Sequence, residues 1–441
     1  MKKYMENGDI ISTIYLAQKK ESMIKKINIR LKKKNVVGGL FAIIATMILM
    51  APYHADNTLW GANFHSIWIG TIYTLSAFTA LLSILLFDFS KKNYGMLFAI
   101  ASVIIYILFG IFHSYNSEYN GVFLAVQCIS FLLLPNDIKK YSFKFFKKIW
   151  VVICVIGIVC FLFYAFKIPV PYQEVPYYFG DSLKYINYGV SFLYQDSEMF
   201  RLCGLCNEPG YLGTICALIL CADCIKIRKK TNIVILIAGL MTFSVAFFVI
   251  LIVYLIMKAM VAIHNNKNTK KKILYYICLV FLVIFYFIVL PNIKTGDTAI
   301  DKTIQRLTIT SEGLVGDNRT TSDFDALFES SLSTNPLFGM GKGYVRASEV
   351  GDNSSYKIYI IEYGIMGSAL IWGTLLVAAL YKNTKNKNVI LFVVVFFASI
   401  YQRPNIIALP YLLILIGGIE YIKTKQIYSS DYLEVKDENK K

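Results

Sequence analysis

The chain has 441 residues, of which 56% are hydrophobic, 15% aromatic and only 17% charged. A water-soluble protein of this size carries roughly 25% charged residues, so the composition excludes an ordinary soluble domain. The net charge of +17 is not gathered in one patch, which argues against nucleic acid as a partner. Of the 45 Lys and Arg residues, 34 lie in short stretches between apolar blocks, at 1–35, 88–93, 136–148, 226–231, 258–272, 382–388 and 423–441. This is the positive-inside pattern of membrane proteins, and it places the basic stretches in the cytoplasm.

The apolar blocks predict helices that span a lipid bilayer. A hydrocarbon core of about 30 Å needs about 20 residues at 1.5 Å per residue, and backbone in lipid must satisfy its own hydrogen bonds. Two long blocks are each divided by a polar turn, near Thr242-Phe243-Ser244 and at Gln402-Arg403-Pro404-Asn405, which keeps the flanking basic stretches on one side. The resulting twelve spans are 36–53, 66–87, 94–112, 121–135, 149–166, 209–225, 231–243, 244–258, 273–290, 358–381, 389–401 and 405–422.

This threading predicts an all-α polytopic membrane protein with about twelve transmembrane helices and both termini in the cytoplasm. A basic N-terminal tail, 1–35, precedes the transmembrane domain, 36–422, and a cytoplasmic tail, 423–441, follows it. Two extracytoplasmic loops, 167–208 and 291–357, interrupt the domain. Loops of this length are usually functional or disordered. Their aromatic content favours partly ordered lids that rest on the membrane.

Two patterns that suggest metal binding are weak. Cys203-x-x-Cys206 and Cys221-x-x-Cys224 have a spacing close to that of a zinc site. The predicted helix between them holds the pairs ~22 Å apart, so we interpret these cysteines as apolar packing residues. Asp323-Phe-Asp325 resembles the metal clamp of nucleotide-sugar transferases, but nucleotide sugars are cytoplasmic and this loop is expected outside.

Two further patterns contribute little. Gly339-Met-Gly-Lys-Gly343 lacks the Gly-Lys-Ser/Thr ending of a P-loop, and we interpret it as a flexible turn whose amides can approach a phosphate. The four histidines lie far from the end of the large loop in the sequence. A histidine base is therefore not expected there.

Arginines beside carboxylates at the outer membrane boundary are the informative feature. Arg201 precedes Glu208 and Pro209, and Pro is favoured at the first position of a helix, so Glu208 is expected at or just before the N-cap. The alternative for Arg201 and Glu208 is a structural ion pair. Arg319 lies in the second loop, where the alternative is a solvated charge. Asp352 and Asn353 close that loop and lead to Glu362.

These clusters resemble the O-antigen polymerase and ligase superfamily of bacterial surface-polysaccharide assembly. The similarity covers about residues 195–422. Arg201, Gly204, Glu208 and Pro209 match the family's Arg-x-x-Gly-x-x-x-Glu-Pro segment, and Thr242-Phe243-Ser244 resembles its serine-containing turn between two short spans. In the large loop, the matches are Arg319, Asn335-Pro336-Leu337-Phe338-Gly339-Met340-Gly341 and Asn353. Glu362, Gly364 and Gly367 match Glu-x-Gly-x-x-Gly. The ligase branch usually has His-Asn where this chain has Asp352-Asn353. That difference favours a polymerase.

The resemblance implies a GT-C-like membrane glycosyltransferase in the bacterial cytoplasmic membrane. Its substrate would be undecaprenyl-diphosphate-linked oligosaccharide, and a chain-length regulator and a flippase would be pathway partners. Arginine binds phosphate oxygens bidentately and stays protonated, so we expect Arg201 and Arg319 to clamp the diphosphate, with Arg403 or Arg306 as a third member. Glu208 or Asp352 would be the base, with Gly204, Pro209, Asn353 and Glu362 as supporting residues. No cofactor, metal or nucleotide is implied. The alternatives are a ligase that uses another acceptor and a flippase for the lipid-linked oligosaccharide.

Overall fold

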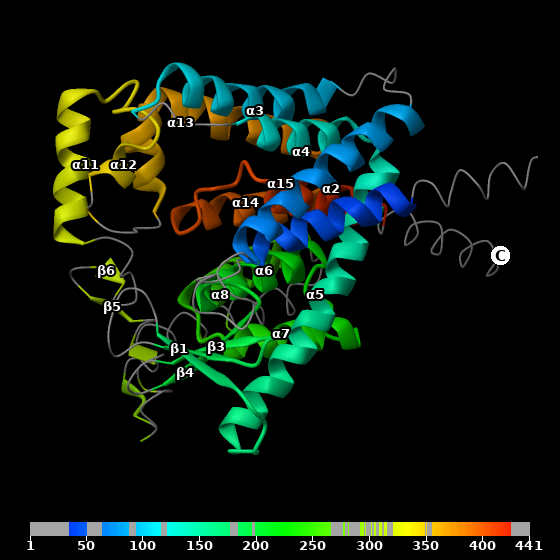
Figure 1. Cartoon of the computed structure of the whole chain (residues 1–441), viewed down its shortest axis with the longest axis vertical. Helices are drawn as coiled ribbons and strands as arrows, with labels where there is room; N and C mark the ends of the chain where they lie inside the picture. The colour runs from blue at the N-terminus through cyan, green and yellow to red at the C-terminus, as the bar shows by residue number, and fades with distance from the viewer. Residues whose placement is uncertain are drawn as a thin grey trace, which may run out of the picture.

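The computed structural model is mostly helical. It describes residues 35–50, 64–87, 94–115, 121–176, 184–195, 199–265, 321–348 and 355–424, together with residues 277, 281, 292–294, 296, 301, 304–305, 308–310, 313–314 and 350. Figure 1 shows most helices running in one general direction, with the small strands and the short helices α11 and α12 gathered on the left of the view.

Four of the described helices are long and apolar enough to cross a membrane: α2 (Phe64–Leu86), α3 (Tyr94–Phe112), α5 (Asn136–Ala165) and α13 (Tyr356–Leu380). The shorter apolar helices are Asn35–Leu49, α4 (Val122–Leu133), α6 (Pro209–Ala222), α7 (Lys230–Met241), α8 (Val245–Asn265) and α14 (Lys387–Ala398). Each of these helices overlaps a predicted apolar block. The predicted block 273–290 lies outside the described residues.

The last helix has mixed geometry. After α14 comes a 3-10 turn, η4 (Ser399–Tyr401), and then a non-helical break at 403–408. The chain resumes as α15 (Leu409–Leu412), passes through a π-helical turn, η5 (Leu413–Gly417), and continues to residue 424. The predicted polar turn at Arg403 is therefore present. Pro410 sits in the first turn of α15, where proline is tolerated.

Helix α6 is the centre of the molecule. Among its residues, Tyr211 is partly exposed and the others are buried. The turn between α7 and α8 approaches α6 closely, because a Cβ at Gly213 would lie 2.8 Å from Ser244 Cβ. Phe243 in that turn has a φ of 45°. The sequence therefore predicted the position of this turn correctly.

The first large loop forms an antiparallel sheet of four strands, which the all-α expectation missed. The strands β1 (Gln173–Pro176), β2 (Lys184–Asn187), β3 (Phe192–Gln195) and β4 (Phe200–Gly204) pair in sequence order. One face packs Ile186, Leu193 and Leu202 into the main core, and the α5 helix lies against β3 and β4. The opposite face carries Arg201, directly across from Tyr194.

The second large loop contains a short two-stranded sheet, β5 (Ile309–Thr310) and β6 (Gly313–Leu314), and the helices α11 (Ser322–Thr334) and α12 (Tyr344–Ala347). Thr321 caps α11, because its Oγ1 accepts a hydrogen bond from Phe324 N at 3.3 Å. A separate small core joins Phe324 to Val345 and to Ile361 of α13. This loop is thus anchored to the start of α13.

Candidate functional site

Arg201 lies on β4 and reaches the turn between α7 and α8. Its Nε donates to Thr242 O at 3.0 Å, and its Nη2 donates to Phe243 O at 3.3 Å. Both carbonyls belong to the turn that packs on Gly213, one helical turn after Pro209. These two hydrogen bonds therefore hold the guanidinium beside the first turns of α6.

Glu208 is the N-cap residue of α6, and Pro209 occupies the first helical position. This confirms the predicted helix start. The loop before it is fixed to the sheet, since Tyr185 Oη donates to Asn207 O at 2.7 Å. Gly204 begins the loop with a φ of +61°, a conformation that favours glycine. Backbone amides at a helix start carry partial positive charge, which stabilises an anionic carboxylate at this position.

Arg403 contacts the Glu208 carboxylate directly. The distance from Arg403 Nη2 to Glu208 Oε2 is 2.5 Å, and the two side chains are 6% and 30% exposed. The guanidinium carbon also lies 5.0 Å from the centre of the Tyr211 ring, within the range of a cation–π interaction. The residue predicted as a weaker third arginine is thus the one that pairs with Glu208.

The cysteines between these charged groups are not reactive. Burial raises the pKa of Cys203 and of Cys206, so both thiols remain neutral. Both are fully enclosed. Among the described residues, no group of three His, Cys, Asp or Glu side chains is arranged to hold a metal ion. The ionised side chains described in this region are those of Arg201, Glu208 and Arg403.

An apolar cavity of about 230 Å³ borders Gln402, the residue before Arg403. It opens between α6, α8 and the end of α14, and its lining includes Thr214, Ile250, Tyr401 and Gln402. Tyr401 stacks on Tyr356 with ring centres 5.4 Å apart. Tyr401 therefore connects the lining of this cavity to the first turn of α13.

The two glycine motifs of the second half interlock. Helix α13 is broken at Gly364, whose φ is 68°. A Cβ on Gly364 would lie 2.2 Å from Leu337 O, and one on Gly339 would lie 2.5 Å from Gly364 N. Met340 N donates to Ile361 O at 2.7 Å, and Ile365 N donates to Pro336 O at 2.9 Å. Each motif needs glycine because the backbone of the other occupies the space.

This packing corrects the expectation of a flexible turn at Gly339–Gly343. The amides of Gly341 and Lys342 donate to Glu362 O and His113 O, at 3.1 and 2.9 Å. Gly343 N donates to Glu362 Oε1 at 2.9 Å. The backbone of this segment is thus rigidly held, and all five of its amides donate to groups of the protein.

His113 is a residue that sequence reasoning missed. The sequence places it far from the loop, yet its Nε2 lies 3.1 Å from Gly339 O. Lys342 was not singled out either. Its ammonium donates to Tyr106 Oη at 2.5 Å and to Tyr363 Oη at 3.1 Å. The contacts of His113 and Tyr106 with the loop join positions more than 200 residues apart, so no local pattern signalled them. Tyr363 lies on α13, 21 positions from Lys342.

The remaining predicted residues divide into two groups. Asp325 is in the first turn of α11 and pairs with Lys357 at 2.7 Å; Glu362 supports the loop as described above. Arg306, Arg319, Asp352 and Asn353 lie outside the described residues. The structure therefore brings together Glu208 and Arg403, with Arg201 bonded to the turn between α7 and α8. Arg306 and Arg319 stay untested.

Comparison of the chain with protein-family models, with curated proteins and with solved structures gave no match.

Proposed function

We propose that this chain is a glycosyltransferase of the bacterial cytoplasmic membrane that joins undecaprenyl-diphosphate-linked oligosaccharide repeat units into a surface polysaccharide. The observation that carries the proposal is the convergence of Arg201 and Arg403 near the Glu208 end of α6. These residues come from segments about 200 positions apart. Arginines held beside a carboxylate at a buried helix start fit a reaction that releases an anionic diphosphate and needs a base.

The proposed topology has about twelve spans with both termini in the cytoplasm. Its support is the helical structure of the described apolar blocks and the opposite character of the two ends of α6. Glu208 and Arg403 mark one end, and Asp223, surrounded by lysines, marks the other. The 14 residues of α6 correspond to about 21 Å at 1.5 Å per residue. We assign the Glu208 end to the outer face and the lysine-rich end to the cytoplasm.

In the proposed reaction, a hydroxyl of the incoming repeat unit attacks the anomeric carbon of the sugar that carries the growing chain. The bond from that carbon to the lipid diphosphate breaks, and the electron pair leaves with the diphosphate. Glu208 accepts the proton of the attacking hydroxyl. A guanidinium has five N–H donors in a planar fork, so Arg403 is able to bridge Glu208 and a phosphate oxygen. Donors placed where charge develops lower the barrier most.

The apolar cavity between α6, α8 and α14 supports a substrate with a hydrocarbon portion. It borders Gln402, the residue next to Arg403, so a polar head and an apolar tail would meet at the arginine. Ligand sites of this type are largely apolar with a few fixed polar groups. This arrangement favours transfer chemistry at the membrane surface over passage of the oligosaccharide through a central cationic channel.

The direct test is reconstitution of the purified chain with undecaprenyl-diphosphate-linked repeat units as the sole substrate. The expected product is a ladder of lipid-linked polymers that differ by one repeat unit. A single larger product on a different acceptor lipid would instead indicate a ligase. Absence of any new glycosidic bond, from protein that elutes as a folded monodisperse species, would contradict the proposal.

A further inference from the structure

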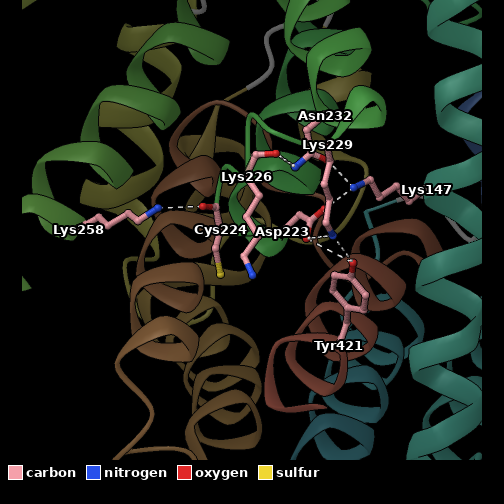
Figure 2. A network of polar contacts seen from close by, with 8 residues as sticks. All are labelled: Lys147, Asp223, Cys224, Lys226, Lys229, Asn232, Lys258 and Tyr421. Carbon is pink, nitrogen blue, oxygen red and sulfur yellow. Dashed lines mark hydrogen bonds and ion pairs between the residues drawn. The ribbon is translucent and has the colours of Figure 1, made fainter. Parts of the chain in front are cut away.

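A second polar cluster lies at the opposite end of α6 from Glu208. Asp223 is the C-cap residue of α6 and is fully buried. Its carboxylate accepts hydrogen bonds from Lys147 and from Lys229, the latter at 3.1 Å, and from Tyr421 Oη at 3.3 Å. Asn232 accepts a further bond from Lys147. Figure 2 shows Lys147, Lys229 and Tyr421 directed toward Asp223, with Asn232 beside Lys147.

Positive charge exceeds negative charge around Asp223. Lys144 Nζ and Lys229 Nζ lie 5.8 and 5.9 Å from the centre of the Tyr421 ring, so three ammonium groups surround this carboxylate and ring. The neighbouring carboxylate of Glu420 pairs with Lys423 at 2.8 Å. In the described segments 136–148 and 223–230 there are nine basic residues and two acidic ones.

Partial burial of these ammonium groups costs the folded protein free energy. Lys147 is 8% exposed as a residue, and desolvation lowers the pKa of Lys229. Removing an ammonium from water costs free energy unless an anion compensates it. Asp223 and the helix C-terminus, which carries partial negative charge, offset part of this cost. A further anion beside Lys144 and Lys229 would offset more.

These lysines lie at the proposed cytoplasmic end of two rows of exposed apolar side chains, one on α5 and one on α7, here called ridges. On α5, Val152, Val155 and Val159 are exposed and follow Lys148 at helical spacing. On α7, which packs against α5, the exposed residues are Ile233, Ile237 and Leu240. Lys144 and Lys148 are both exposed and one helical turn apart. The surface therefore has ammonium groups at one end and hydrocarbon along its length.

We propose that this surface binds one anionic phospholipid of the cytoplasmic leaflet. The headgroup phosphate contacts Lys144, Lys148 and Lys229, and the acyl chains lie along the exposed ridges of α5 and α7. Basic sites between membrane helices at the cytoplasmic side recognise anionic headgroups in this way. The buried contacts of Asp223 with Lys147 and Lys229 hold the site together. The proposal requires membrane insertion but is independent of the proposed transferase activity.

The test is native mass spectrometry of the full chain in detergent, with phosphatidylglycerol or phosphatidylcholine added at matched concentrations. The test variant is Lys144→Gln/Lys148→Gln, which leaves the contacts of Asp223 intact. The control is Lys382→Gln/Lys385→Gln, which removes two exposed lysines of another basic stretch. A Lys144→Arg/Lys148→Arg variant keeps the charge.

The wild type, the control and the arginine variant should retain phosphatidylglycerol in preference to phosphatidylcholine. The glutamine test variant should bind phosphatidylglycerol about 30-fold more weakly, since each lysine near an anionic headgroup contributes about 1 kcal/mol. If the control bound phosphatidylglycerol as weakly as the glutamine test variant, the effect would come from general surface charge, and the proposal would be overturned. Equal retention of both lipids, or displacement of phosphatidylglycerol by inorganic phosphate at millimolar concentration, would also overturn it.

Discussion

Arg403 and Glu208 are 195 positions apart in the sequence, and their side chains meet at 2.5 Å. The contact joins the break before α15 to the N-cap residue of α6. The Arg403 side chain is 6% exposed and the Glu208 side chain 30%, so the pair is largely shielded from water. Such a pair is weak evidence for stability, because desolvation offsets attraction. The proposed function gives this pair a catalytic role, which mutation can separate from a structural one.

A double-mutant cycle on this pair separates the two roles. Glu208→Gln leaves the buried guanidinium without that carboxylate and should destabilise the chain by about 2 kcal/mol, below the ~3–5 kcal/mol of fully buried pairs because Glu208 is partly exposed. Glu208→Gln/Arg403→Gln should recover part of this loss, with a coupling of about 1–2 kcal/mol. Thermal unfolding in detergent measures the stability. Polymer formation should stay absent in Glu208→Gln, in Arg403→Gln and in the double variant, and activity in the double variant would argue for a purely structural pair.

The interlocked glycines make a prediction about folding. In Gly364→Ala the new Cβ would lie 2.2 Å from Leu337 O, and alanine would have to adopt a φ of 68°. We therefore expect little monodisperse protein from this variant. Gly373 on the same helix has no atom within 4 Å of the added Cβ. Gly373→Ala should therefore be neutral or slightly stabilising. Size-exclusion chromatography of fluorescent fusions compares the two. Equal yields would show that the close approach of the two motifs is not required.

The Asp-x-Asp motif should not bind a catalytic metal. Asp325 pairs with Lys357 at 2.7 Å, and both side chains are partly exposed, so Asp325→Asn should change stability by about 0–1 kcal/mol. Polymer formation should continue in EDTA, and Asp323→Asn should retain most activity. Loss of activity in EDTA that Mn²⁺ restores in the wild type and fails to restore in Asp323→Asn would refute this interpretation.

Cysteine labelling tests the orientation of the chain. Lys184→Cys in the sheet and Ser322→Cys at the start of α11 should react with an impermeant reagent in whole cells, after outer-membrane permeabilisation where such a membrane exists. Lys385→Cys, also at an exposed position, should react only after lysis. The native cysteines of the described residues are buried, except Cys224, which is partly exposed, so a wild-type control measures the background. Labelling of Lys385→Cys in intact cells would invalidate the predicted topology.

The helical segments were predictable because each one is encoded locally, by a continuous apolar block that ends at polar or basic residues. The turns at Thr242 and Arg403 were found for the same reason: polar residues interrupt a continuous apolar run. The sheet was missed, although Asn187 and Gly189 gave a signal. Gly189 has a φ of 77°, and its amide donates to Asn187 Oδ1 at 2.7 Å, a turn typical of the loop between two strands.

The site was only partly predictable, because its contacts are not local. Glu208 at the helix start followed from Pro209, a sequence neighbour. The pairing of Glu208 with Arg403, and of Arg201 with the carbonyls of Thr242 and Phe243, depends on how distant helices pack. The Asp223 cluster illustrates the same limit. Its lysines were attributed to topology alone, while their burial and mutual approach are properties of the folded chain.

The most direct test of the central claim compares conservative arginine variants in the reconstituted polymerisation assay. Lysine keeps the charge of Arg201 but loses the planar fork, so Arg201→Lys should lower the polymerisation rate by about 10²–10³, the typical cost of one lost transition-state donor. Arg346→Lys, at an exposed position on α12, is the matched control and should give the wild-type ladder. We predict unpolymerised lipid-linked repeat units with folded Arg201→Lys protein. A full ladder from Arg201→Lys would contradict it.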